Sequence, residues 1–439
     1  MLYRNGEYWG VYELREKVDD LDFTSYYYDQ DEPNVEFLQT WGSTWAPYGV
    51  NAQNNWNTFL AWVNANNLNV PANYNYIDSV YNIESLTDYF ILNSFTVCQD
   101  WLNWNTAWWR GLDPAGKKKK WRYTLWDMDA TFGHYINYTG VPNTGPSADP
   151  CDPNTLNDPG GQGHVPILNK LMQTDTFKVY YINRYVDLVN TVFNCNNMHQ
   201  VLDSMIAAID PEMDAQCTKW GGTKSGWQAS VNTLSNFIDD RCVQLINGFI
   251  NCYDLKGPYE VQINAIPKAG GVVKFNSLFI DDYVWTGKYF GNIKQYLAPI
   301  PNPGYHFTHW SIEGDTLFPS NNDSLVFLNI DTNIKVIAHF EFEDTTTTKN
   351  EIFVPTAFSP NGDGENDVFK VYGDSIETVT MEVYNRWGEK VFSSNNKNEG
   401  WRGTYKDQLL NSDVFTFRVE VVMENKKRIS KKGSITLMR

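Results

Sequence analysis

The chain has 439 residues and a mass of 50.6 kDa, with 42% hydrophobic and 15% aromatic residues. This length indicates about three domains, or one large domain with smaller ones, and the apolar content excludes wholesale disorder. The formal net charge of -17 argues against nucleic acid as a partner, and no run of apolar residues is long enough to form a transmembrane segment.

The first part of the chain predicts a hairpin followed by helices. Residues 1–20 alternate apolar and polar side chains on either side of an Asn5-Gly6 pair, which predicts two short strands joined by a tight turn. Apolar side chains recur three and four positions apart around residues 59–63 and again over 84–98. This spacing predicts two helices, each with one apolar face.

Two further strands are predicted at 106–110 and 121–126, after the helix at 84–98. Residues 139–164 are rich in Pro, Gly, Asn and Asp, which predicts a long loop, and long loops inside a compact domain are often functional. Helical spacing then returns over 165–252. Residues 1–255 therefore read as one α+β domain that is mostly helical.

Strand patterns dominate the rest of the chain. Residues 256–343 alternate apolar and polar side chains, which predicts a small β domain. The Thr-rich run at 344–350 reads as a linker, and residues 351–439 alternate again, which predicts a C-terminal β-sandwich. The sequence thus predicts a multidomain protein with a helical first domain and two β domains.

The cysteine pattern bears on the cellular compartment. No Cys-x-x-Cys pair occurs and histidine is scarce, so a zinc site is not expected. An even number of cysteines fits an exported protein with some disulfides, and buried free thiols are the equally weighted alternative. The six cysteines are Cys98, Cys151, Cys195, Cys217, Cys242 and Cys252.

Acidic residues with a distinctive spacing are the strongest chemical signal. Asp100 is followed five residues later by Asn105, and Asp127 and Asp129 come after the second predicted strand. In the catalytic loop of protein kinases, an Asp with this spacing accepts the proton of the substrate hydroxyl and the Asn holds Mg²⁺. Each motif alone is weak, because Asp and Asn also commonly cap turns.

Together, the motifs resemble a known family. The matching segments carry N-G-E-Y-W-G, D-W-L-N-W-N, W-D-M-D-A-T-F-G and V-P-I-L-N-K-L, and they lie at 5–19, 100–110, 121–133 and 165–178. In these segments the chain resembles the spore coat protein CotH family, over about residues 1–255. That family has an atypical protein-kinase-like fold, and some members phosphorylate secreted proteins.

The resemblance implies roles for particular residues. Asp100 would be the catalytic acid/base, Asn105 a metal ligand and Asp127 the metal-binding Asp, with Asp129 as the alternative for that last role. The implied cofactors are Mg²⁺ and ATP. Hard oxygen ligands of this kind suit Mg²⁺.

The first motif raises a separate expectation. Glu13 and Glu16 lie where the family passes from its N-lobe into the hinge, and we assign them to cofactor binding, with exposed strand acids as the alternative. The family places an N-lobe, with the lysine that pairs with ATP phosphates, before the N-G-E-Y motif. We therefore expect a truncated sequence, and a chain that binds ATP poorly and is inactive by itself.

The C-terminal residues carry a second resemblance. Residues 353–369, 383–388 and 433–439 resemble the gliding-motility-associated C-terminal domain, the type B sorting signal of the type IX secretion system of Bacteroidetes. This implies that the protein engages that machinery and is secreted or attached to the outer cell surface. Less strongly, residues 261–267 and 304–310 resemble internalin B-repeat-like modules.

Two functions from different classes follow. The favoured one is a secreted or surface kinase that transfers phosphate from a nucleotide to hydroxyl groups of a secreted or surface protein. The alternative is a non-enzymatic surface protein that uses a degenerate kinase fold for adhesion or coat assembly.

Overall fold

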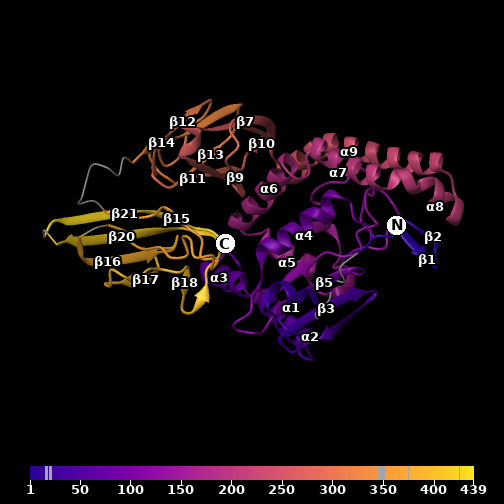
Figure 1. Cartoon of the computed structure of the whole chain (residues 1–439), viewed down its shortest axis with the longest axis horizontal. Coiled ribbons are helices and arrows are strands. Elements are labelled where there is room, and N and C mark those ends of the chain that lie inside the picture. Colours follow the sequence, from indigo (N-terminus) through magenta and orange to yellow (C-terminus); the bar gives the residue numbers. More distant parts are fainter. Residues whose placement is uncertain (15–17, 19–21, 344–351, 374, 425) are drawn as a thin grey trace. The chain divides into compact units, whose positions relative to one another are not determined.

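A computed structural model describes the chain except residues 15–17, 19–21, 344–351, 374 and 425 (Figure 1). The chain divides into two compact units, Met1–Pro258 and Tyr259–Arg439. The first unit holds the helices, and the second is built of strands. Among the described residues, no helix is both long and apolar enough to cross a lipid bilayer.

The first unit contains a hairpin and a four-stranded antiparallel sheet of order β4-β3-β5-β6. The hairpin turns at the predicted Asn-Gly pair, where both residues have positive φ. The strands are β1 (Leu2–Arg4), β2 (Glu7–Gly10), β3 (Val35–Trp41), β4 (Ser43–Tyr48), β5 (Thr106–Gly111) and β6 (Arg122–Thr124).

Helices make up most of the first unit, and α7 and α9 run side by side (Figure 1). The N-terminal helices are α1 (Asp22–Tyr28), α2 (Ala52–Ala65), α3 (Pro71–Val80) and α4 (Ile83–Phe95). The later helices are α5 (His164–Leu171), α6 (Asp175–Asn190), α7 (Cys195–Ile209), α8 (Met213–Trp220) and α9 (Lys224–Tyr253).

Helix α4 lies at the centre of the first unit. It begins where the Asn82 side chain accepts a hydrogen bond from the backbone N–H of Ser85, at 2.8 Å. Buried side chains cover its whole circumference, as expected for a helix enclosed by other elements. Its end at Phe95 leads directly into the segment that holds Asp100.

Two disulfides join distant parts of the first unit. Cys151 pairs with Cys252 and Cys195 pairs with Cys242, while Cys98 and Cys217 are free thiols. Both expectations for the cysteines are therefore partly met. Each bridge ends on α9, which ties this long helix to the 139–164 loop and to α7.

The small β domain consists of two four-stranded sheets, of order β10-β7-β14-β12 and β13-β11-β8-β9. Strands β7 and β14 pair in parallel, and β12 pairs with β14 antiparallel. The strands are β7 (Lys256–Ile266), β8 (Gly271–Phe275), β9 (Leu278–Ile280), β10 (Trp285–Gly291), β11 (Lys294–Pro301), β12 (Tyr305–Glu313), β13 (Val326–Asn329) and β14 (Ile334–Phe342).

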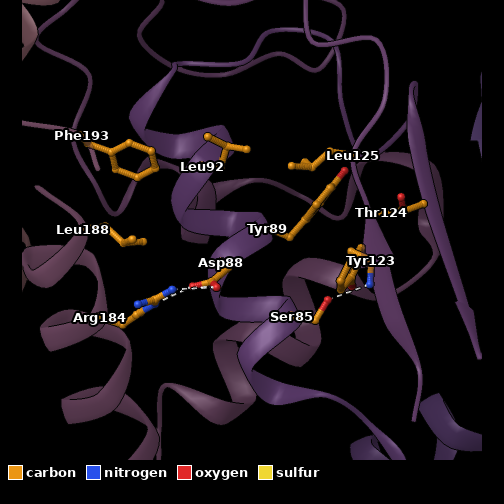
Figure 2. A pocket seen from close by; sticks show the side chains of 10 residues that line it. All are labelled: Ser85, Asp88, Tyr89, Leu92, Tyr123, Thr124, Leu125, Arg184, Leu188 and Phe193. Carbon is orange, nitrogen blue, oxygen red and sulfur yellow. Dashed lines mark hydrogen bonds and ion pairs between the residues drawn. The ribbon is translucent and has the colours of Figure 1, made fainter. Parts of the chain in front are cut away.

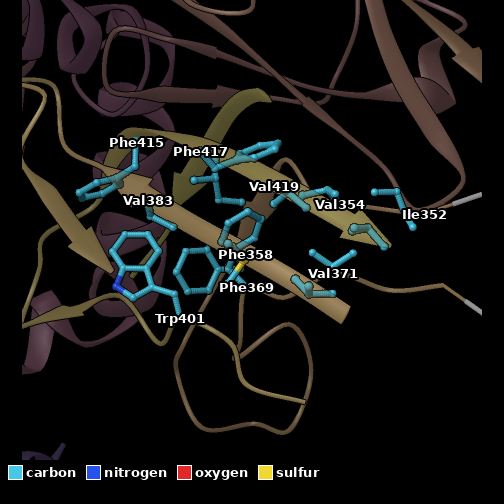
Figure 3. Close-up of a cluster of buried hydrophobic side chains, with 14 of the residues drawn as sticks. Ile352, Val354, Phe358, Phe369, Val371, Val383, Trp401, Phe415, Phe417 and Val419 are labelled. Carbon is cyan, nitrogen blue, oxygen red and sulfur yellow. The ribbon is translucent and has the colours of Figure 1, made fainter. Parts of the chain in front are cut away.

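The C-terminal residues form one five-stranded sheet of order β15-β21-β20-β16-β17. Against it pack apolar side chains from irregular segments, with the rings of Phe358, Phe369 and Trp401 gathered together (Figure 3). The predicted two-layer arrangement thus has one regular sheet and a second layer with little regular structure. The strands are β15 (Ala357–Phe358), β16 (Ile376–Tyr384), β17 (Lys390–Ser394), β18 (Thr404–Tyr405), β19 (Gln408–Leu409), β20 (Asp413–Met423) and β21 (Arg428–Leu437).

Candidate active site

The segment after α4 folds through several residues with left-handed backbone. Val97, Leu102 and Asn105 have φ values of 51°, 65° and 44°. Such values are unusual for residues other than glycine, and a β-branched residue such as Val97 is a clear outlier. Strain of this kind costs about 1–3 kcal/mol per residue and persists only where the surroundings impose it. The 97–105 loop is therefore held in shape from outside.

The restraint comes from the loop at 127–139. The backbone N–H of Gln99 donates to the carbonyl of Ala130 at 2.9 Å, and that of Phe132 donates to Thr96 at 2.7 Å. The hydroxyl of Thr139 accepts from the N–H of Trp101 at 2.8 Å and donates to its carbonyl at 2.7 Å. These bonds run on both sides of Asp100 and keep the two loops together.

Within this frame, Asp100 and Asn105 contact each other directly. The amide nitrogen of Asn105 donates to Oδ2 of Asp100 at 2.9 Å. The second oxygen of each side chain, Oδ1 in both cases, is buried without a hydrogen-bond partner. Buried acceptors are rarely left unpaired, so each unpaired oxygen calls for an explanation.

The later acids lie close enough to act on Asp100. Burial raises the pKa of the Asp100 carboxyl above its ordinary value, and the negative charges of Asp129 and Asp127 raise it further. Asp127 is half-buried with a φ of 52°, whereas Asp129 is exposed. The structure therefore brings together four of the residues singled out in the sequence: Asp100, Asn105, Asp127 and Asp129.

The two N-terminal acids are in a different situation. Glu13 is exposed on the segment after β2, and Glu16 lies outside the described residues. The neighbouring backbone contacts α8, since the N–H of Val11 donates to Gln216 at 2.9 Å and the ring of Trp220 donates to the carbonyl of Trp9 at 2.7 Å. Cofactor binding by Glu13 and Glu16 stays a prediction.

Two residues that shape the site are missing from the sequence prediction. Thr139 bridges the loops, and Gly160 approaches so closely that a Cβ there would lie 2.7 Å from the carbonyl oxygen of Leu102. Gly160 also has a φ of 80°, which favours glycine. The Gly-rich composition of residues 139–164 indicates a loop, but nothing local indicates which distant residue it contacts.

The donor atoms at this site are compatible with Mg²⁺. Among the residues that the structure describes, no three His, Cys, Asp or Glu side chains are placed to hold a metal ion together. A metal here would need the amide oxygen of Asn105 and water molecules besides one or two carboxylates. Mg²⁺ accepts such a mixed set of oxygen ligands, and the two unpaired buried oxygens fit this requirement.

An exposed aromatic ridge lies beside the 97–105 loop. We define it as Trp41, Trp104, Tyr135 and Tyr138, whose rings follow one another with centroids 5.4–5.9 Å apart. Trp41 is 59% and Tyr135 is 56% exposed. The amide of Asn103 joins the ridge to the loop by donating to the carbonyl of Tyr138 at 3.0 Å. Exposed aromatic groups of this extent often mark an interaction surface.

A separate pocket of about 460 Å³ lies between α4, α6 and β6 (Figure 2). Arg184 and Asp88 form a two-point ion pair on its wall, with nitrogen–oxygen distances of 2.8 and 3.0 Å. Tyr89 lines this pocket, and its ring also contacts Trp101, with centroids 5.9 Å apart. Neither Asp100 nor the acids at 127 and 129 line the pocket, so it is distinct from the candidate active site.

Comparisons with known proteins identify three segments. Residues 1–245 match the CotH kinase protein family, residues 284–344 the divergent InlB B-repeat domain, and residues 352–437 the CHU_C type IX secretion signal domain. A search of the curated proteins gave no match. Among solved structures, BcpA, the major pilin subunit of Bacillus cereus, matches at 9% identity and a TM-score of 0.11, covering 41% of this chain and 68% of that one.

The three family matches confirm the resemblances stated from the sequence. The secretion signal domain also has a direct consequence. A protein that carries it engages the type IX secretion machinery and is secreted or displayed at the cell surface.

Proposed function

Because the chain belongs to the CotH kinase protein family, we propose that it transfers a phosphoryl group from a nucleotide to hydroxyl groups of secreted or surface proteins. One observation carries this proposal: Asp100 is bound by Asn105, and both later acids act on its pKa. The order of helix, Asp-Asn loop, strand pair and acidic loop supports a comparison of residues 1–255 with the C-lobe of a kinase.

Asp100 would act as the base. A raised pKa makes its carboxylate a stronger proton acceptor, while the group stays ionised near neutral pH. The hydrogen bond from Asn105 fixes Oδ2 and leaves Oδ1 to take the proton of the acceptor hydroxyl. The loop contacts through Gln99 and Thr139 would hold this oxygen in place.

Asn105 and Asp127 would hold Mg²⁺, with Asp129 as the alternative to Asp127. When bound, the ion would supply positive charge to the phosphates of the nucleotide. Its presence would also relieve the repulsion that raises the pKa of Asp100. Contacts of Glu13 and Glu16 with ATP are part of the proposal but rest on the family resemblance alone.

The proposal is tested by phosphate transfer from radiolabelled ATP with Mg²⁺, using the full-length gene product and extracts of secreted proteins as acceptors. We expect Asp127→Asn to abolish labelling, because an amide lacks the charge that holds the metal. Asp100→Asn should reduce the rate by about a hundredfold or more, the usual contribution of a general base. Asp31→Asn, an exposed acid outside the site, is the matched control.

The second candidate function, adhesion without catalysis, is favoured by the aromatic ridge. Mn²⁺ binding, followed by electron paramagnetic resonance, separates the two. A kinase site predicts binding that Asp127→Asn weakens and Asp31→Asn leaves unchanged. If the well-folded protein neither binds Mn²⁺ nor labels any acceptor with several nucleotides, the adhesion function replaces the kinase.

A further inference from the structure

A pair of histidines faces each other across two strands of the small β domain. His309 on β12 lies directly opposite His339 on β14. Their rings are parallel within 2°, with centroids 4.3 Å apart. Both side chains are half-buried on the sheet surface, and the neighbouring Trp310 and Ala338 point into the core. The pair therefore belongs to the outer face of the sheet.

Hydroxyl groups fix one nitrogen of each ring. Nδ1 of His309 is hydrogen-bonded to the hydroxyl of Thr308 at 3.0 Å, and Nε2 of His339 is hydrogen-bonded to the hydroxyl of Ser311 at 2.8 Å. Among the described residues, neither Nε2 of His309 nor Nδ1 of His339 has a hydrogen-bond partner. Histidines that bind metals usually have their second nitrogen fixed by a polar group in this way.

We propose that His309 and His339 form a two-histidine site for a divalent transition-metal ion, Cu²⁺ or Zn²⁺, with water completing the coordination. A metal bound at about 2.0 Å to each of two nitrogens can join nitrogens up to about 4 Å apart. Rings separated by 4.3 Å reach this arrangement through small rotations about their side-chain bonds. Imidazole suits both ions, and Cu²⁺ binds such sites most tightly.

The surroundings favour a bound cation. Glu341 follows His339 by two residues on β14, so its carboxylate stands on the same face of the sheet. Burial lowers the pKa of His339, and the neighbouring His309 lowers it further. Metal ions bind the neutral ring, so a lowered pKa keeps this ligand available at neutral pH. A histidine pair that only stacks across the sheet is the competing explanation.

The test titrates the full chain, freed of metal by a chelating resin, with Zn²⁺ followed by calorimetry. We expect His309→Ala and His339→Ala each to weaken this binding at least tenfold. His306→Ala is the matched control, because His306 lies on the same strand but faces Glu341 and Glu343, at 3.7 and 3.5 Å. Equal binding by the wild type and both pair variants, or loss in His306→Ala alone, would overturn the proposal.

A second measurement guards against misfolded variants. His339→Phe keeps an aromatic ring opposite His309 but removes both nitrogens, so it should retain the thermal stability of the domain and lose the metal. Electron paramagnetic resonance of the Cu²⁺-loaded wild type should show coupling to two imidazole nitrogens. Coupling to one nitrogen or none, or an unchanged spectrum in His339→Phe, contradicts the site.

Discussion

Asp100 shows how a reactive side chain can oppose stability. Its carboxyl is half-buried next to two other acids, and its pKa is raised above the unfolded value. A group with a raised pKa stabilises the fold fully only below its unfolded pKa, and this stabilisation is lost as the pH rises through the folded pKa. At neutral pH the ionised Asp100 therefore destabilises the first unit.

We accordingly expect Asp100→Asn to raise the melting temperature at pH 7 in metal-free buffer while it removes phosphate transfer. An amide in this position carries no charge that Asp127 and Asp129 can repel. Thermal unfolding followed by circular dichroism measures the effect, with Asp31→Asn as an exposed control. A lower melting temperature for Asp100→Asn would show that its hydrogen bond with Asn105 outweighs the repulsion.

His164 predicts a different dependence on pH. This ring is fully buried beside Tyr123, whose hydroxyl lies 2.7 Å from Nδ1, and burial lowers its pKa from 6.5 to about 3. Above pH 6.5 the ring is neutral in both states, so its contribution to stability is complete there. As the pH falls from 6.5 toward 3, the unfolded chain binds a proton that the folded chain does not, and stability is lost.

The expected loss for the first unit is about 2 kcal/mol between pH 7 and pH 5, at about 1.4 kcal/mol for each pH unit below 6.5. Urea unfolding at the two pH values measures it. His164→Gln should lower stability at pH 7 but flatten the pH dependence by about that amount. Parallel pH profiles for both proteins would rule out His164 as the source.

At the scale of elements, the sequence predicts structure well where one face is polar. The hairpin at residues 2–10, helix α4 and strands β5 and β6 lie where the patterns place them. Strand β3 has no such signal, because six of its seven residues are buried or half-buried and the apolar–polar alternation is lost. Even Glu36 on this strand is buried, where it pairs with Arg110 at 2.7 Å.

The candidate site follows the same division. Asp100, Asn105, Asp127 and Asp129 carry recognisable spacing within short segments, and the structure places them together. Thr139 and Gly160 act through contacts with residues 38 and 58 positions away, for which a single sequence holds no local signal. Position in the chain reveals the chemical groups of a site better than it reveals what holds them.

Helix α9 stabilises the approach to the site through Arg241. This fully buried guanidinium donates to the carbonyls of Ser94 and Phe95 at the end of α4, at 2.9 and 3.1 Å, and to Pro146 at 3.0 Å and Ala148 in the long loop. Unpaired helix-end carbonyls favour a cation. One side chain thereby joins α9, α4 and the 139–164 loop.

We expect Arg241→Met to destabilise the first unit by about 3–5 kcal/mol, because four buried carbonyls lose their donor. Arg241→Lys should recover only part of the loss, since an ammonium cannot reach four acceptors in the geometry of a guanidinium. Urea unfolding measures both variants. A loss below about 1 kcal/mol would mean that water replaces the missing donors.

At the scale of the whole molecule, the two disulfides fit the secreted or surface location. They close loops with sequence separations of 101 and 47 residues. Loops of this size reduce the entropy of the unfolded chain by the equivalent of about 4–5 kcal/mol for each bridge. The first unit therefore depends on an oxidising environment, which a secreted protein meets.

Reduction with dithiothreitol should lower the melting temperature of the first unit, and Cys151→Ser should reproduce part of this effect without reductant. Cys217→Ser is the matched control, because Cys217 is a free thiol on α8. Differential scanning calorimetry can follow the first unit and the β domains as separate transitions. Equal shifts for Cys151→Ser and Cys217→Ser would contradict a stabilising role for the bridge.

The order of the cysteines along the chain also sets a timetable for oxidation. The two bridges are nested, since Cys195 and Cys242 lie between Cys151 and Cys252. Both bridges need a cysteine of α9, so neither native bridge can form until α9 has been synthesised and exported. Until then Cys98, Cys151 and Cys195 can pair only wrongly, and thiol–disulfide exchange must later undo such pairs. Folding ends this exchange for Cys98, because burial raises its pKa to about 12 and removes the thiolate that attacks disulfides.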